Sequence, residues 1–114
     1  MFLTSRSGNR SFFAVRDGQI IGHAALLETE ETVVLAVSYL YIRAEKPGQG
    51  LGHRLMMLIE EEAQKIVGTN ALRLKVRTYN PRAAHVYEAN GFLPVRREGT
   101  LIIMRKQLKA SWGA

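Results

Sequence analysis

The chain has 114 residues, of which 46% are hydrophobic and 23% charged, as expected for one globular domain. It contains no cysteine, which excludes disulfides, thiolate nucleophiles and cysteine-based metal sites, and no apolar run reaches the ~20 residues that a membrane span needs. We therefore expect a single domain over residues 1–114, located in the cytoplasm and without membrane contact.

The net charge of +6 is concentrated in the second part of the chain. Residues 1–67 contain 7 Lys and Arg against 8 Asp and Glu, whereas residues 68–114 contain 9 against 2. This asymmetry indicates a polyanionic ligand or partner. A nucleic acid and a phosphate-rich cofactor both fit that description.

The first third of the chain is typical of strands. Two short strands flank the hairpin signal Asp17-Gly18 within residues 11–28, and residues 33–42, rich in β-branched and aromatic side chains, predict a third. Residues 1–4 leave room for one more short strand.

The middle of the chain predicts a helix followed by a strand. Apolar residues recur at helical spacing over residues 51–66, so we expect an amphipathic helix that ends before Gly68. Residues 72–76 alternate between apolar and basic side chains, which indicates a half-buried strand.

A second helix begins at Asn80-Pro81, because Asn can cap a free amide and Pro has no N–H to leave unpaired. It should end at Gly91, and residues 93–97 and 100–106 predict two final strands. The whole order predicts an α/β fold whose sheet has strands of mixed direction.

Three glycines, Gly48, Gly50 and Gly52, separate the third strand from the first helix. Glycines at such a junction let the backbone approach a phosphate, and the helix start supplies unpaired N–H groups and a positive dipole end. A flexible connector is the alternative interpretation. The Walker A and dinucleotide patterns both fail, because each would need another residue where His53 stands.

A third type of phosphate loop does match. The segment Pro47-Gly48-Gln49-Gly50-Leu51-Gly52 resembles the pyrophosphate loop of the GNAT superfamily of N-acetyltransferases, Arg/Gln-x-x-Gly-x-Gly/Ala. The preceding Leu40-Tyr41-Ile42 is similar to the strand that pairs with the pantetheine arm in that family. Pro47 replaces the leading Arg or Gln, and Lys46 offers a charge nearby.

A second segment strengthens the resemblance: Val76-x-x-x-Asn80-x-x-Ala83-x-x-x-Tyr87-x-x-x-Gly91-Phe92 is similar to a later strand–helix unit of the family. The resemblance implies that Asn80 contacts the cofactor arm and that Tyr87 protonates the departing thiolate. Taken alone, Asn80 is more often a helix cap and Tyr87 more often a core aromatic.

The resemblance implies a GNAT-like α/β fold with a mixed, mostly antiparallel sheet and two main helices. This fold would be truncated at the N-terminus, since it lacks the helices that usually form the wall of the acceptor pocket. It implies acetyl-CoA as co-substrate and a primary amine, on a small molecule or a protein, as acceptor. A backbone amide of Leu40 or Ile42 would serve as the oxyanion donor. The residues assigned to the cofactor are Leu40, Tyr41, Ile42, Lys46, Pro47, Gly48, Gln49, Gly50, Leu51, Gly52, His53, Asn80, Ala83 and Tyr87. A sheet without its covering helices exposes apolar surface, so we also expect a homodimer.

The general base is harder to place. Family members often use a Glu on the strand before the loop, but residues 38–42 contain no carboxylate. Glu28 in the hairpin and Glu45 in the loop are the candidates, and of these Glu28 is taken as catalytic together with Tyr87. A water molecule is the other proton acceptor allowed.

No metal site is expected, since His23, His53 and His85 fall on separate elements. The basic residues Arg73, Lys75, Arg77, Arg82, Arg96 and Arg97 form either a solvated face or contacts with cofactor phosphates or an acidic acceptor. Polyamine acceptors match such a basic chain poorly.

Two other functions stay open beside N-acetyl transfer. One is an acetyl-CoA-binding module without turnover, and the other is a basic nucleic-acid-associated protein. Against nucleic acid, Phe12, Phe13, Tyr39 and Tyr41 fall in strand patterns that predict core positions.

Overall fold

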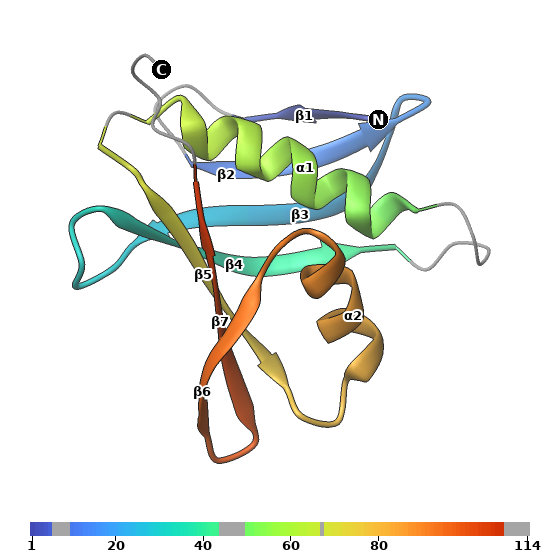
Figure 1. The fold of residues 1–114 in the computed structure, drawn as a ribbon. Coiled ribbons are helices and arrows are strands. Elements are labelled where there is room, and N and C mark those ends of the chain that lie inside the picture. The colour runs from blue at the N-terminus through green and yellow to red at the C-terminus, as the bar shows by residue number, and fades with distance from the viewer. Residues whose placement is uncertain (6–9, 44–49, 67, 109–114) are drawn as a thin grey trace.

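The computed structural model describes residues 1–5, 10–43, 50–66 and 68–108, which form a seven-stranded sheet and two helices (Figure 1). The strands are β1 Phe2–Thr4, β2 Ser11–Arg16, β3 Gln19–Glu28, β4 Val34–Ile42, β5 Ala71–Arg77, β6 Leu93–Glu98 and β7 Leu101–Gln107, and the helices are α1 Leu51–Gln64 and α2 Pro81–Ala89. The strand order is β1-β2-β3-β4-β5-β7-β6, with β4 and β5 parallel and the other neighbours antiparallel. The predicted mixed, mostly antiparallel α/β fold is confirmed, and the boundaries differ from those predicted by one or two residues.

The hairpin between β2 and β3 forms as its sequence predicts. Asp17 and Gly18 have φ values of 52° and 76°. Two successive positive φ values are the signature of the type I′ turn, whose twist matches that of paired strands. Neither helix of the described chain is both long and apolar enough to cross a bilayer.

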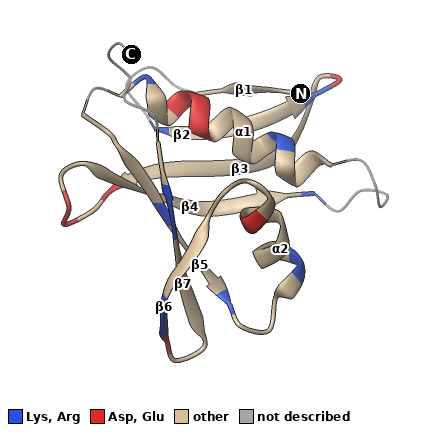
Figure 2. Ribbon diagram, viewed as in Figure 1, with Lys and Arg blue, Asp and Glu red and all other residues tan. Residues whose placement is uncertain are grey.

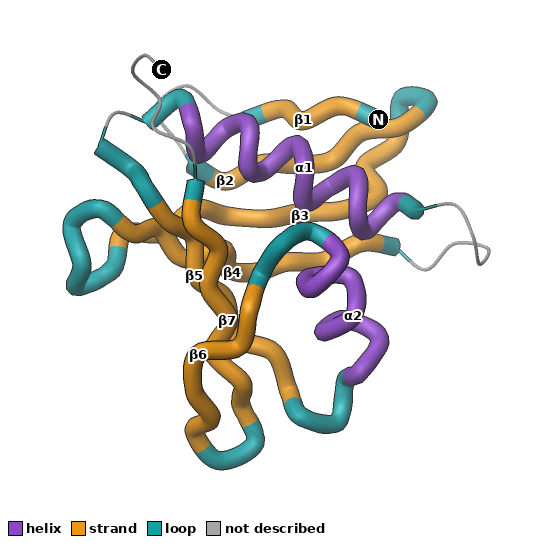
Figure 3. Tube along the Cα trace, viewed as in Figure 1, coloured by secondary structure: helices purple, strands orange, loops and turns teal. Residues whose placement is uncertain are grey.

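Helix α1 covers one face of the sheet (Figure 3). Its buried side chains, among them Leu55, Ile59 and Ala63, pack against Phe12 and Leu26 in the main hydrophobic core. Full burial of an aliphatic side chain contributes about 1.5–3 kcal/mol. We call the opposite side of the sheet the outer face, and no helix of the described residues covers it.

Helix α2 has both of its predicted caps. The Asn80 Oδ1 accepts a hydrogen bond from the Ala83 amide at 3.2 Å. At the other end Gly91 has a φ of 91°, and the Phe92 amide donates to the Tyr87 carbonyl at 3.1 Å. Phe92 then enters the core with 1% of its surface exposed, which anchors the end of the helix.

Strands β4 and β5 separate soon after they meet. Their register runs only from Val34 opposite Ala71 to Ala36 opposite Arg73, and beyond Ala36 no further β4–β5 pair forms. The two strands diverge in Figure 1, and α2 lies beside the opening. The rest of β4 therefore keeps β3 as its hydrogen-bonded neighbour on one side only.

Three of the four aromatic residues predicted to be buried lie on the outer face instead. Phe12 is buried as predicted, but Phe13, Tyr39 and Tyr41 are 41%, 74% and 59% exposed. Alternation along β2 sends Phe12 and Phe13 to opposite faces. Phe13 lies opposite His23, which lies opposite Tyr41, so these side chains form a row across three strands. The prediction was wrong for these three because an outer face without a covering helix leaves them exposed.

Candidate active site

The start of α1 presents free backbone donors. Gly50 is the N-cap with a φ of 65°, and the first helical bond runs from the Arg54 amide to the Gly50 carbonyl at 3.0 Å. The amides of Leu51, Gly52 and His53 precede that bond and so have no partner within the helix. Together with the helix dipole they suit an anion. The other predicted loop residues, Lys46, Pro47, Gly48 and Gln49, lie outside the described residues, as does Glu45.

A cavity of about 210 Å³ opens beside this helix start, between β4, α1 and α2. We call it the helix-side cavity. Apolar side chains such as Leu55 and Val86 form much of its wall, and Arg82 adds a cation. A Cβ atom on Gly52 would lie 3.6 Å from the Val86 side chain, an ordinary van der Waals distance, so the start of α1 lies close to α2 here. Six residues assigned to the cofactor come together here: Leu40, Ile42, Gly52, Asn80, Ala83 and Tyr87.

The structure does not bring three other predicted residues to this cavity. Tyr41 lies on the outer face with 59% of its surface exposed. His53 is exposed at the first turn of α1, and Leu51 packs against the core. For His53 and Leu51, the backbone amide is therefore the group available to a ligand at the helix start.

A second cavity, of about 690 Å³, fills the opening between β4 and β5. We call it the interstrand cavity. Ser38 and Tyr39 of β4 line one side, and Lys75 and Arg77 of β5 line the other. The part of β4 that has lost its β5 partner borders this space, which leaves one edge of its backbone free for a ligand.

Leu40 and Tyr87 line both cavities. The Tyr87 ring packs edge-on against Phe92 with centroids 6.4 Å apart, which fixes its orientation. Burial raises the pKa of the Tyr87 hydroxyl above its ordinary value, because a phenolate would lose its hydration there. At neutral pH the hydroxyl is therefore protonated and able to donate.

A backbone distortion in β4 lies at the same place. The register with β3 shifts between Ala25, which pairs with Ser38, and His23, which pairs with Tyr41. Tyr39 has a φ of 52°, a conformation that costs a non-glycine residue about 1–2 kcal/mol. A hydrogen bond of 3.1 Å joins the His23 Nδ1 and the Tyr39 carbonyl. The sequence does not predict this bulge, since no glycine or asparagine signals it.

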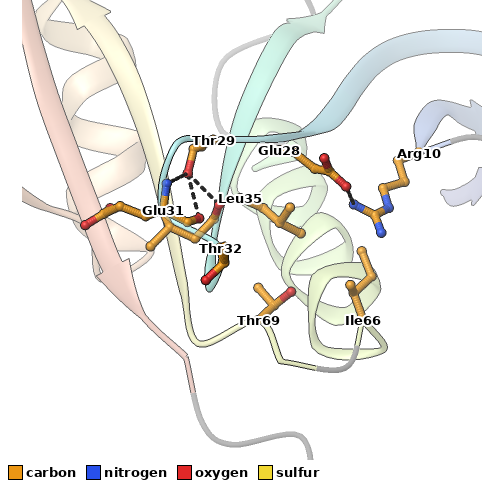
Figure 4. Close-up of a pocket in the computed structure, with 9 residues that line it drawn as sticks. Arg10, Glu28, Thr29, Glu31, Thr32, Leu35, Ile66 and Thr69 are labelled. Atoms are coloured by element: carbon orange, nitrogen blue, oxygen red, sulfur yellow. Dashed lines mark hydrogen bonds and ion pairs between the residues drawn. The ribbon is translucent and has the colours of Figure 1, made fainter.

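Glu28, the predicted general base, occupies a different part of the molecule. It lies opposite Leu35, at the end of β4 that still pairs with β5. Its side chain is 85% exposed and forms an ion pair of 3.7 Å with Arg10. Figure 4 shows both residues at a separate cavity of about 350 Å³ that Thr69 also lines. The structure thus does not bring Glu28 together with Tyr87.

His, Asp and Glu side chains form no group of three or more suited to a metal ion within the described ranges. His23 lies on β3, His53 on α1 and His85 on α2, which are three separate elements. No carboxylate is among the described residues that line the helix-side or the interstrand cavity.

The sequence model of the acetyltransferase (GNAT) family matches residues 2–92. The chain belongs to the GNAT acetyltransferase family. The activity class of this family is acyl transfer, and the matched residues include the start of α1, β5 and α2.

Solved acetyltransferase structures share this fold over most of the chain. A PaiA N-acetyltransferase from Thermoplasma acidophilum in complex with coenzyme A is 26% identical, with a TM-score of 0.76 over 86% of this chain and 60% of that one. An acetyltransferase from Thermus thermophilus is 28% identical, with a TM-score of 0.73 over 86% of this chain and 63% of that one. The ribosomal-protein-S18-alanine N-acetyltransferase from Escherichia coli is 24% identical, with a TM-score of 0.73 over 89% and 71%. The chain thus spans less than two thirds of the first two of these GNAT proteins.

Proposed function

We propose that this chain transfers an acetyl group from acetyl-CoA to a primary amine of a small molecule or protein. The observation that carries the proposal is the position of Tyr87, which lines both the helix-side and the interstrand cavity. With the thioester arm in the helix-side cavity and the acceptor amine in the interstrand cavity, the Tyr87 hydroxyl would lie beside both reacting groups.

The residues present fit coenzyme A. The pyrophosphate would lie at the free amides of Leu51, Gly52 and His53, and Arg82 offers a countercharge at the same cavity. The pantetheine arm contains two amide groups, and the unpaired edge of β4 offers backbone partners for them. Asn80 caps α2 through its Oδ1, which leaves its NH₂ group as the donor toward the arm. Bound acetyl-CoA would supply the activated acetyl group.

The transfer itself forms one bond and breaks one. The nitrogen of a neutral amine bonds to the acetyl carbon, the thioester C–S bond breaks, and the electron pair leaves with the sulfur. Tyr87 gives its proton to the sulfur and recovers one from solvent, while the amine nitrogen gives up a proton. A backbone amide of Leu40 or Ile42 in distorted β4 would stabilise the oxyanion.

Water is the proton acceptor in this proposal, because Glu28 is at the separate cavity with Arg10. The cations Lys75 and Arg77 border the interstrand cavity. Nearby positive charge disfavours a protonated amine, so the acceptor is driven toward its nucleophilic form without a carboxylate base.

Two measurements test the proposal. Calorimetric titration with acetyl-CoA should give micromolar binding, whereas ATP and NAD should bind far more weakly. Release of free thiol in the presence of an amine panel then reports turnover, and the absence of cysteine removes any background from the protein. Selective binding without thiol release would instead identify a cofactor-binding module, and absence of binding would refute both.

A nucleic-acid-associated role is the second candidate, because exposed Tyr39 and Tyr41 share the outer face with basic residues of β5. It predicts RNA binding that weakens steeply with salt. Salt-insensitive or undetectable binding would remove it.

We also propose that two copies associate through the outer face of β1–β4. Phe13, Tyr39 and Tyr41 are exposed there, together with Phe2 at 58% and Leu27 at 40%. Aromatic side chains gathered on one face are typical of protein interfaces.

A further inference from the structure

We propose that the acceptor is a primary amine that carries a carboxylate close to its amino group, and that Lys75 and Arg77 bind this carboxylate in the interstrand cavity. The inference rests on the proposed acetyl transfer and goes beyond it by naming the acceptor class. It begins from the charge of the cavity, which basic residues line and to which no Asp or Glu of the described chain contributes.

The pattern of β5 sends its basic side chains to the outer face. Leu72, Leu74 and Val76 are buried in the core, so the alternate residues Arg73, Lys75 and Arg77 project the other way. Figure 2 shows basic residues along β5 and acidic residues in the turn between β3 and β4.

Arg73 is already neutralised by that turn. Its guanidinium donates two hydrogen bonds to the Glu30 carboxylate, at 2.7 and 2.8 Å. The same contact lowers the pKa of Glu30 to about 2, so this carboxylate stays charged at neutral pH. Arg73 therefore has little charge left for a ligand.

Lys75 and Arg77 are not neutralised in this way. Neither forms an ion pair with a carboxylate of the described residues. The Arg77 Nη1 donates to the Thr100 Oγ1 at 3.0 Å, which orients the guanidinium and leaves its other N–H groups for a ligand. Two residues apart on one face of a strand, the two cations are separated by about 7 Å along β5. They offer a carboxylate one bidentate and one point-charge contact.

The cations and Tyr87 line the same cavity. When the nitrogen of an acceptor amine lies beside Tyr87, the substituents next to that nitrogen therefore lie against β5. A carboxylate there is stabilised, a neutral carboxamide gains less, and the second cation of a diamine is repelled.

Matched acceptors test the inference. Glycine, β-alanine and γ-aminobutyrate are compared with their carboxamides, and the C-terminally amidated peptide Ala-Glu-Glu with amidated Ala-Gln-Gln, by thiol release at saturating acetyl-CoA. We expect kcat/KM, calculated on the concentration of neutral amine, to favour the anionic member of each productive pair by about tenfold or more, as charge-assisted hydrogen bonds allow. The free amino acids and the peptides distinguish a small-molecule from a protein source of the same chemistry.

Variants locate the effect. Lys75→Gln and Arg77→Gln should each reduce the preference, and Lys75→Glu should reverse it, without a change in the calorimetric Kd for acetyl-CoA. Arg97→Gln is the matched control, because Arg97 is a cation of β6 that does not line the cavity. A turnover-independent comparison is the calorimetric affinity for N-acetyl-β-alanine against its carboxamide, which should show the same order.

The outcomes separate the two proposals. Acetylation of neutral and anionic amines at equal kcat/KM would overturn the acceptor class while leaving acetyl transfer intact. Failure of every amine to react, with acetyl-CoA bound, would overturn the proposed function and the acceptor class with it.

Discussion

Tyr39 adopts a backbone conformation that is unfavourable for its residue type, and it does so beside the candidate site. Its φ of 52° is costly for an aromatic side chain, and the bond between His23 and its carbonyl helps to hold it. The distortion lies where β4 has separated from β5, so the free strand edge and the bulge coincide. The strained residue is thus next to Leu40, one of the two residues whose backbone amide is proposed to stabilise the oxyanion.

At Tyr87 the prediction concerns proton donation. Tyr87→Phe keeps the ring against Phe92 but removes the hydroxyl, so we expect kcat to fall by about 100-fold, the scale of one general acid, with the Kd for acetyl-CoA unchanged. Because burial raises the pKa of this hydroxyl, the wild type keeps its proton donor as pH rises through the neutral and mildly alkaline range. Steady-state kinetics at several pH values measure kcat, and calorimetry measures the Kd for acetyl-CoA.

Tyr79→Phe provides the control, since Tyr79 is 74% exposed and lines neither cavity. Equal kcat in wild type and Tyr87→Phe would exclude Tyr87 as the donor.

Among the elements, the start of α1 has the clearest test. Gly50→Ala places a methyl group on a residue with a φ of 65°, which costs about 1–2 kcal/mol and disturbs the free amides of the first turn. We expect the affinity for acetyl-CoA to fall by about tenfold through the loss of one charge-assisted contact. Thermal unfolding and calorimetry separate stability from binding.

Gly68→Ala is its matched control. Gly68 has a φ of 88°, and apart from the adjacent residues no atom of the described chain lies within 4 Å of a Cβ added to either glycine, so the backbone strain is similar. Gly68 follows the far end of α1, and its substitution should lower stability without affecting affinity. If both variants bind acetyl-CoA like the wild type, the start of α1 does not hold the cofactor.

The pair between Glu30 and Arg73 links the β3–β4 turn to β5. Because the folded-state pKa of Glu30 is lowered from 4.5 to about 2, its contribution to stability is present above pH 4.5 and is lost as pH falls toward 2. Glu30→Gln should therefore be less stable than wild type at pH 7, and the difference should disappear across that acidic window. Chemical denaturation at several pH values measures it.

Glu61→Gln removes an exposed carboxylate of α1 that no ion pair of the described residues includes, and it should follow the wild-type pH dependence. A constant difference between wild type and Glu30→Gln from pH 7 to 2 would contradict the linkage.

At the scale of the whole molecule, we expect the outer face to determine the oligomeric state. Phe13→Ser combined with Tyr41→Ser removes two aromatic side chains from the row across β2, β3 and β4. If that face joins two copies, light scattering at micromolar concentration should show a dimer for wild type and a monomer for the double variant.

Val95→Ser is the comparison, because Val95 is 56% exposed but lies on β6, away from the row. A monomeric wild type would refute the dimer, and a double variant that stays dimeric would move the interface elsewhere.

Much of the fold could be predicted because its signals are local. Asp17-Gly18 specifies a hairpin, Asn80 caps α2, and Gly91 ends it, each through interactions over a few residues. The apolar period of α1 likewise identifies its buried face.

Tertiary structure alone decided where β4 leaves β5, since the two strands are separated in sequence by α1 and nothing in either one limits their pairing to three residues. It also decided that Tyr87 lines two cavities, that Tyr41 faces away from them, and that Glu28 lies at a third. The sequence by itself determined the elements and their caps, because backbone hydrogen bonding and amphipathic periods act over short range. Which side chains share a cavity depends on sheet register and on one bulge, and these are settled by long-range packing.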